Sequence, residues 1–252
     1  MMRSSPRPRA NLPTRPCDLS RSARIALAGL DLVPDLSGAL HIPDFATLVV
    51  ADLHFEKGSS LARRGLHVPP YDTRATLRLL AQAIETSEAR HLICLGDSFH
   101  DGEARARIDR DDLAFLRNLT AAIETTWISG NHDPEPAADL GGRVAGQVVL
   151  GPLSLRHAPA ALAAGEYEIA GHLHPAARIA RRGRSIRCRC FIGDGRRLIM
   201  PAFGSYTGSL DVSAPAIASL FDVAHVWMLG RERIHRFPAC LLYTSDAADE
   251  GL

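Results

Sequence analysis

The chain has 252 residues, 46% of them hydrophobic, and a formal net charge of +1. This length is enough to bury a full α/β core, and the near-neutral charge excludes a uniformly basic surface for nucleic acid. A site for a polyanion must therefore come from a local cluster of charge or from bound metal ions. No apolar run is long enough to cross a bilayer, so we expect no membrane association.

The two ends of the chain differ in character from its middle. Residues 1–22 are rich in Arg, Pro and Ser and lack an apolar segment, which predicts a disordered tail rather than a secretory signal. Residues 240–250 read CLLYTSDAADE, which resembles a translated sequencing adapter, so we interpret residues 240–252 as a non-native tail. One domain is then expected over residues 23–239.

The cysteines are odd in number and irregularly spaced, which indicates free thiols in a reducing compartment, the cytoplasm. They are Cys17, Cys94, Cys188, Cys190 and Cys240.

The first predicted elements are strands. Residues 25–34 and 39–42 are apolar runs joined by Asp-Leu-Ser-Gly, a pattern typical of a β-hairpin. Residues 47–51 form a continuous apolar run that ends at Asp52. Such a run indicates a strand that is buried on both faces.

Helices and strands then alternate. Residues 72–87 place apolar side chains at helical spacing, with Asp72 as the expected N-cap, and residues 109–123 form a second amphipathic helix. Buried strands are predicted at residues 91–95 and 125–129. The order strand, helix, strand, helix, strand predicts a parallel α/β half.

The second half of the chain reads as strands with little helix between them, which predicts a mostly antiparallel sheet facing the first sheet within one domain. The expected strands are residues 147–156, 167–171, 187–192, 197–201, 224–229 and 233–237.

Five polar blocks stand at or just beyond the ends of predicted strands. The carboxyl edge of an α/β sheet is where sites form, because rigid strand ends hold exposed loops there. The blocks are Asp52-Leu53-His54, Gly96-Asp97, Gly130-Asn131-His132-Asp133, His157 and Gly171-His172-Leu173-His174.

The residue types in these blocks are those that bind hard or borderline metal ions: carboxylate, amide oxygen and imidazole, with no thiolate. Asp52 and His54 are two residues apart, so on an extended strand end both can bind one ion, and His172 and His174 repeat this spacing. Asp97 has no such neighbour and could bridge two ions. A single histidine is more often packed or exposed than a ligand, but five blocks in this order predict a metal centre.

The blocks D-x-H, G-D, G-N-H-D, H and G-H-x-H resemble those of the calcineurin-like metallophosphoesterases over about residues 46–203. More narrowly, LVVADLHFEKGSSLARRG, LGDSFHD and SGNHD are similar to the bacterial ligase-associated DNA damage response endonucleases. The resemblance implies an α/β fold, a four-layer α-β-β-α sandwich with two facing mixed sheets.

The resemblance also implies how the site is divided between two divalent ions, with Mn favoured and Fe or Zn as the other candidates. Residues Asp52, His54, Asp97 and His174 would hold the first ion. Residues Asp97, Asn131, His157 and His172 would hold the second. His132 would not bind metal but would act on the phosphate as an acid or charge stabiliser, with Asp133 orienting it. The role of His100, in the block that follows Asp97, stays open.

The implied activity is hydrolysis of phosphodiester bonds by a DNA endonuclease of DNA repair, with single-stranded DNA as substrate and a functional association with a DNA ligase and a helicase. Two alternatives remain. One is a phosphatase or phosphodiesterase for small nucleotides or phosphoproteins, which would use the same metals. The other is a non-catalytic scaffold, which the complete set of ligand types disfavours.

An arginine cluster follows the last of these blocks and could either contact a polyanion or be a solvated hairpin. Its members are Arg178, Arg181, Arg182, Arg184, Arg187 and Arg189.

Overall fold

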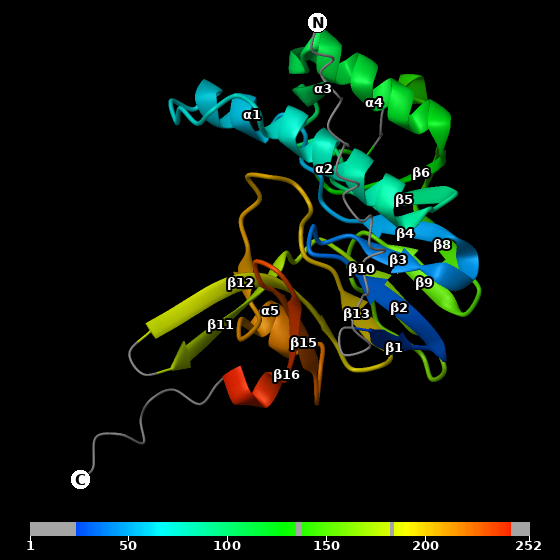
Figure 1. Ribbon diagram of the computed structural model, residues 1–252, viewed down its shortest axis with the longest axis vertical. Coiled ribbons are helices and arrows are strands. Elements are labelled where there is room, and N and C mark those ends of the chain that lie inside the picture. The colour runs from blue at the N-terminus through cyan, green and yellow to red at the C-terminus, as the bar shows by residue number, and fades with distance from the viewer. Residues whose placement is uncertain (1–23, 135–137, 182–183, 243–252) are drawn as a thin grey trace, which may run out of the picture.

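A computed structural model describes residues 24–134, 138–181 and 184–242 of the chain (Figure 1). The tail predicted at residues 1–22 lies outside these ranges, as do Cys17 and residues 243–252. Of the segment interpreted as non-native, residues 240–242 are described, and they belong to the short 3-10 helix η4 (Ala239–Leu242). The four described cysteines are free thiols, as predicted.

The first sheet has seven strands that follow one another in chain order. They are β1 (Ile25–Leu27), β2 (Leu30–Pro34), β3 (Leu40–Ile42), β4 (Thr47–Val50), β5 (His91–Leu95), β6 (Glu124–Ile128) and β7 (Arg143–Ala145). Neighbours are antiparallel from β1 to β4 and parallel from β4 to β7, which confirms the predicted parallel half. The segment 25–34, predicted as one strand, is itself a hairpin, because Ala28 and Gly29 adopt positive φ angles of 54° and 78°.

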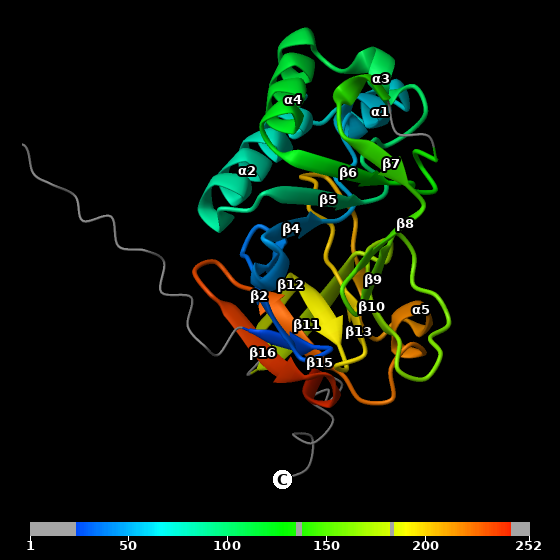
Figure 2. The same ribbon diagram turned by 90° about the vertical axis from the view of Figure 1, so that its right-hand side faces the viewer.

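Helices cover the outer face of this sheet (Figure 2). They are α1 (Lys57–Arg63), α2 (Asp72–Ser87), α3 (Ala104–Arg107) and α4 (Arg110–Ala122). Leu77 and Leu80 of α2 pack with Leu116 of α4 in one buried cluster against the sheet. The prediction that Asp72 is the N-cap of α2 is wrong. Tyr71 holds that position, and the Asp72 carboxylate instead accepts a hydrogen bond from the Gly58 amide at 2.9 Å.

The second sheet has nine strands and is mostly antiparallel, as predicted. They are β8 (Gln147–Leu150), β9 (Leu153–Arg156), β10 (Tyr167–Ala170), β11 (Pro175–Arg181), β12 (Arg184–Gly193), β13 (Arg197–Ile199), β14 (Leu210–Asp211), β15 (His225–Leu229) and β16 (Ile234–Pro238). The segment 147–156 was predicted as one strand. It is a hairpin that turns at Gly151, where φ is 57°.

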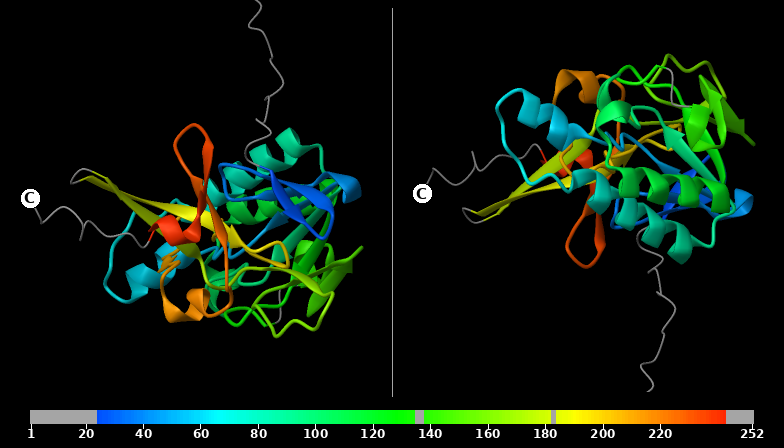
Figure 3. Two further views of the ribbon diagram at one scale, coloured as in Figure 1. Left: turned by 90° about the horizontal axis from the view of Figure 1, so that it is seen from below. Right: turned by 90° about the horizontal axis from the view of Figure 1, so that it is seen from above.

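β11 was not among the predicted strands, and its residues 176–181 pair with β12. The two strands form an arm that projects from the body of the molecule (Figure 1; Figure 3). The base of this arm and α1 lie on the same side of the molecule in both views.

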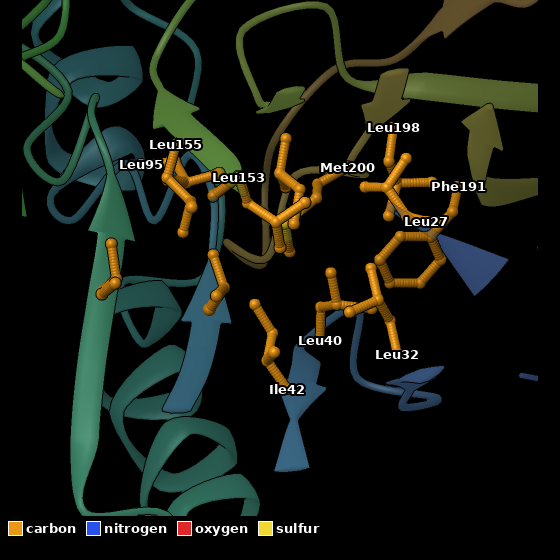
Figure 4. Packing of buried hydrophobic residues seen from close by; sticks show 14 of the residues in the cluster. Leu27, Leu32, Leu40, Ile42, Leu95, Leu153, Leu155, Phe191, Leu198 and Met200 are labelled. Carbon is orange, nitrogen blue, oxygen red and sulfur yellow. The ribbon is translucent and has the colours of Figure 1, made fainter. Parts of the chain in front are cut away.

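The main core lies between the two sheets (Figure 4). Leu40 and Leu95 from the first sheet pack with Leu153, Phe191 and Met200 from the second, and all five are fully buried. Apolar side chains also line the outer face of the second sheet, where the short helix α5 (Pro215–Ala218) packs. The order α-β-β-α is therefore confirmed, with a fourth layer reduced to α5 and its flanking loops. No helix among the described residues has both the length and the apolar character that a bilayer crossing requires.

Candidate metal centre

The predicted ligands lie in loops where strands of both sheets end. β4, β5 and β6 lead into the blocks of Asp52, Asp97 and Asn131, while β9 and β10 lead into those of His157 and His172. Backbone hydrogen bonds tie these loops together. The His54 amide donates to the Asp97 carbonyl at 2.9 Å, and the Gly171 amide donates to the His157 carbonyl at 2.8 Å. The site is therefore shared by the two sheets.

Asp52, His54 and His174 form the first group of potential ligands, with ligand atoms that all lie within 4.8 Å of one another. Asp52 Oδ1 lies 3.3 Å from His174 Nε2. The other Asp52 oxygen accepts a hydrogen bond from the His172 amide at 2.9 Å. His174 Nδ1 donates to the Gly208 carbonyl at 3.2 Å, so in the neutral ring Nε2 is the lone-pair nitrogen that a metal ion requires.

Asp97, His157 and His172 form the second group, again within 4.8 Å. His157 Nδ1 donates to the Leu95 carbonyl at 2.9 Å, which turns its Nε2 towards the site. That nitrogen lies 2.8 Å from Asn131 Oδ1, 3.1 Å from His172 Nδ1 and 3.5 Å from Asp97 Oδ1. The amide oxygen of Asn131 thus joins this group.

Asp97 lies between the two groups. Its Oδ1 is the oxygen close to His157, while its Oδ2 is 3.9 Å from His54 Nε2. The carboxylate is 2% exposed and can therefore be reached from both groups but hardly from solvent.

The donor set fits metal ions. Asp52 Oδ1, His54 Nε2 and His174 Nε2 are buried atoms without a hydrogen-bond partner among the described residues. Leaving such atoms unsatisfied is costly, and a cation among them would remove that cost. Burial, followed by the charge of His174, lowers the pKa of His54 to about 2, so this imidazole is neutral, the form that binds metal.

Several ligands adopt an uncommon backbone conformation. The φ angles of Asp52, His54, Asp97, His172 and His174 are 54°, 45°, 45°, 69° and 45°, all in the left-handed region. Asp and His tolerate this region better than most residues, but it still strains the chain. The loops are thus bent so that the ligand side chains converge.

His132 lies at the surface of the site, and its side chain is 41% exposed. Its Nε2 lies 4.0 Å from Asp97 Oδ2, and its Nδ1 donates to the His100 carbonyl at 2.8 Å. The ring also stacks on that of His100, with centroids 5.2 Å apart. His100 in turn places its Nδ1 3.3 Å from His54 Nδ1. His100 therefore contacts both the predicted acid and a predicted ligand.

Asp133 does not make the orienting contact that the sequence suggested. Its carboxylate accepts a hydrogen bond from the Phe99 amide at 3.0 Å, and no hydrogen bond joins it to His132 among the described residues. Burial, with the nearby charge of Asp97, raises the pKa of Asp133 to about 7. The His132 ring is held by His100, and Asp133 fixes the loop that carries His100.

The three described side chains of the arginine cluster have different partners. Arg189 donates to the carbonyl oxygens of Ala202 and Ser37, so it joins parts of the fold. Arg187 donates to Ser209 beside the Gly208 carbonyl that holds His174. Arg178 is exposed on the arm and donates to Ser185. Arg182 and the side chains of Arg181 and Arg184 lie outside the part of the chain that the structure describes.

Comparisons with known proteins agree with this site. Residues 45–176, which include every predicted ligand, match the family model of the calcineurin-like phosphoesterases. The solved structure of the nuclease MPE from Pseudomonas putida is 30% identical, covers 85% of this chain and 98% of its own, and has a TM-score of 0.68. Yfce, a phosphoesterase from E. coli, is 16% identical over 76% of this chain and 97% of its own, with a TM-score of 0.39. A search of curated proteins gave no match.

The extent of the family match, together with the identity to the nuclease MPE over most of both chains, is consistent with the narrower resemblance to the ligase-associated endonucleases. The chain belongs to the calcineurin-like phosphoesterases and is a metal-dependent phosphoester hydrolase.

Proposed function

We propose that this protein is a two-metal phosphodiesterase that cleaves DNA, with single-stranded DNA as its substrate. The observation that carries the proposal is the pair of ligand groups with Asp97 between them. Two sites that share one carboxylate are the arrangement in which both oxygens of a phosphodiester displacement can be stabilised together.

The proposed ligands divide between two ions. Asp52, His54, Asp97 and His174 would hold the first ion. Asp97, Asn131, His157 and His172 would hold the second. When bound, two divalent ions, Mn for preference, would lower the pKa of water towards neutrality and stabilise the attacking and leaving oxygens. Their charge exceeds that of the Asp52 and Asp97 carboxylates, so the site would attract an anionic diester.

His132 would supply the proton for the leaving oxygen. Nδ1–H donates to the His100 carbonyl, which leaves Nε2 of this exposed side chain as the atom that would donate to the substrate. A covalent intermediate on the protein is not required, and none of the proposed site residues is a Ser or Cys.

DNA is favoured over small phosphate esters by the similarity to a solved structure described as a nuclease. Under this proposal the enzyme works in DNA repair in the cytoplasm, in association with a DNA ligase and a helicase. The alternative is a phosphatase or phosphodiesterase for small nucleotides or phosphoproteins, since the same ligands would serve either substrate.

Steady-state assays of the Mn-loaded protein on single-stranded DNA, a cyclic nucleotide and a chromogenic diester separate these functions. We expect cleavage of DNA with a higher kcat/KM than for either small substrate. Ready turnover of the small esters without cleavage of DNA would replace the nuclease by the alternative.

A further inference from the structure

We infer that Lys57 and Arg64, at the two ends of α1, form a phosphate-binding track for the nucleic-acid strand that enters the metal centre. This inference rests on the proposed function and names the surface of the chain that would bind the substrate outside the scissile phosphate.

Lys57 is the only lysine in the chain and lies beside the metal centre. Its amide donates to the carbonyl of the predicted ligand His54 at 3.2 Å. The carboxylates of Asp52 and Asp97 act on its ammonium group electrostatically, while burial lowers the pKa of Lys57. The Lys57 side chain is half-buried.

The position of Lys57 is fixed by its neighbours in the chain. The Glu56 amide donates to Thr73 Oγ1 at 2.9 Å, and the Gly58 amide donates to the Asp72 carboxylate at 2.9 Å. Both bonds reach α2, so the first turn of α1 is held between the metal loop and a long helix. A cation placed in this way is preorganised to bind an anion.

Arg64 lies seven residues further on, directly after α1, which is two helical turns along the same face. It is exposed, and its charge acts on His100. At a rise of about 1.5 Å per residue, Lys57 and Arg64 are separated by about 10 Å along the helix. A single phosphate ester cannot span that distance, but a strand with successive phosphates can.

The arginines near Lys57 and Arg64 differ from these two residues because acidic side chains pair with them. Arg63 pairs with Glu103, and Arg107 pairs with Asp101 at 2.8 Å. Among the described residues, neither the Lys57 nor the Arg64 side chain has an ion pair or a hydrogen bond. The unpaired positive charges of α1 therefore lie at its two ends, with Lys57 next to the His54 loop and Arg64 directly after the helix.

The salt dependence of binding tests the track directly. Binding of a single-stranded oligonucleotide of about 16 nucleotides is measured over a salt series with Mn-loaded His132→Ala protein, a background chosen to limit cutting. Adding Lys57→Ala or Arg64→Ala should each reduce the slope of log K against log salt by about 0.7, and adding both by about twice that. Lys57→Arg should restore the slope. Arg63→Ala is the matched control, since its charge is already paired, and its slope should equal that of the parent.

Chemical labelling gives a second readout that does not depend on turnover. Because Lys57 is the only lysine, an amine-directed acetylating reagent can modify only Lys57 and the terminal amine. The same oligonucleotide should reduce acetylation of Lys57, measured by mass spectrometry, at least about 10-fold. This is the factor expected when one good phosphate contact occupies the amine.

The outcomes separate this inference from the proposed function. Suppose that the wild-type protein cleaves DNA, that the double variant keeps the slope of its His132→Ala background, and that Lys57 is acetylated equally with and without oligonucleotide. The track is then refuted, and the nuclease function stands. A slope that responds to Arg178→Ala instead would assign binding to the arm. If the wild-type protein neither binds nor cleaves DNA, the track and the proposed nuclease function both fail.

Discussion

Asp97 lies between the two ligand groups, and its two oxygens face different histidines. Replacing the carboxylate with an amide removes one charge and one oxygen ligand. We expect Asp97→Asn to lose at least one ion per chain and most of its turnover, as measured by elemental analysis and by hydrolysis of a chromogenic diester. Asp139→Asn, which alters an exposed carboxylate outside the site, serves as the control. Two ions and near-normal activity in Asp97→Asn would contradict the bridging role.

His132 belongs to neither group of converging ligand atoms, and its Nε2 lies 4.0 Å from Asp97 Oδ2. We expect His132→Ala to retain both ions and to lose about 10²–10⁴-fold in kcat, the usual contribution of a general acid. The loss should be smaller for a substrate with a good leaving group, which needs little protonation. Equal losses for good and poor leaving groups would argue against proton donation and leave only charge stabilisation.

At the scale of elements, the loops after the strands are packed so tightly that two of their glycines cannot be replaced without displacing ligands. A Cβ on Gly130 would lie 2.2 Å from the Asp97 amide and from its Oδ1. A Cβ on Gly96, where φ is 74°, would lie 2.6 Å from the His157 ring. Gly96 and Gly130 therefore allow the ligands of neighbouring loops to approach one another.

Gly130→Ala should consequently push Asp97 out of place. We expect metal affinity to fall at least about 10-fold and the free energy of unfolding to decrease by about 1–3 kcal/mol, as for overpacking of a buried site. Gly102→Ala is the matched control, because a Cβ there meets no atom within 4 Å. Titration with Mn and denaturant unfolding measure the two effects. Wild-type metal affinity in Gly130→Ala would show that the loop relaxes freely.

The sequence predicts some elements well and others poorly for physical reasons. β4 and β5 are continuous apolar runs because they are buried on both faces, so their ends could be placed. β11 carries no such run and is a strand because it pairs with β12, which no local pattern reveals. α1 has only seven residues and starts after Glu56, a non-glycine residue with φ of 66°, so neither periodicity nor a capping residue marks it.

The site, too, has parts that the sequence predicts and parts that it does not. The ligand types of Asp52, Asp97 and His172 could be predicted because they follow strands whose ends meet at one edge of the fold. The contact between His132 and His100 could not, because it depends on how two separate loops pack. In the sequence Lys57 is distinguished only by being the single lysine, and its place beside the ligands emerges from the fold.

At the scale of the whole molecule, the metal centre joins the two sheets. Asp52 and Asp97 follow strands of the first sheet, and His157 and His174 follow strands of the second. Ions held by residues of both sheets would bind the folded chain but not the unfolded one, so they would stabilise the fold.

We therefore expect Mn to raise the melting temperature and chelation to lower it. At a free metal concentration of 1,000 times Kd the stabilisation is about 4 kcal/mol per site. For a chain of this size that corresponds to a rise of about 10 °C, which calorimetry can measure. Asp97→Asn should show a much smaller rise. An unchanged melting temperature in metal-loaded wild type would mean that the ligands do not bind ions across the sheets.

The left-handed backbone at the ligands also bears on how this protein could be engineered. Each strained residue costs about 1–3 kcal/mol, and the buried carboxylates of Asp52 and Asp97 repel each other when no cation separates them. Glycine at Asp52 or Asp97 would relieve both the strain and the repulsion. A library selected only for heat resistance in a chelating buffer would therefore enrich robust but inactive proteins, whereas the same selection in Mn would retain the site.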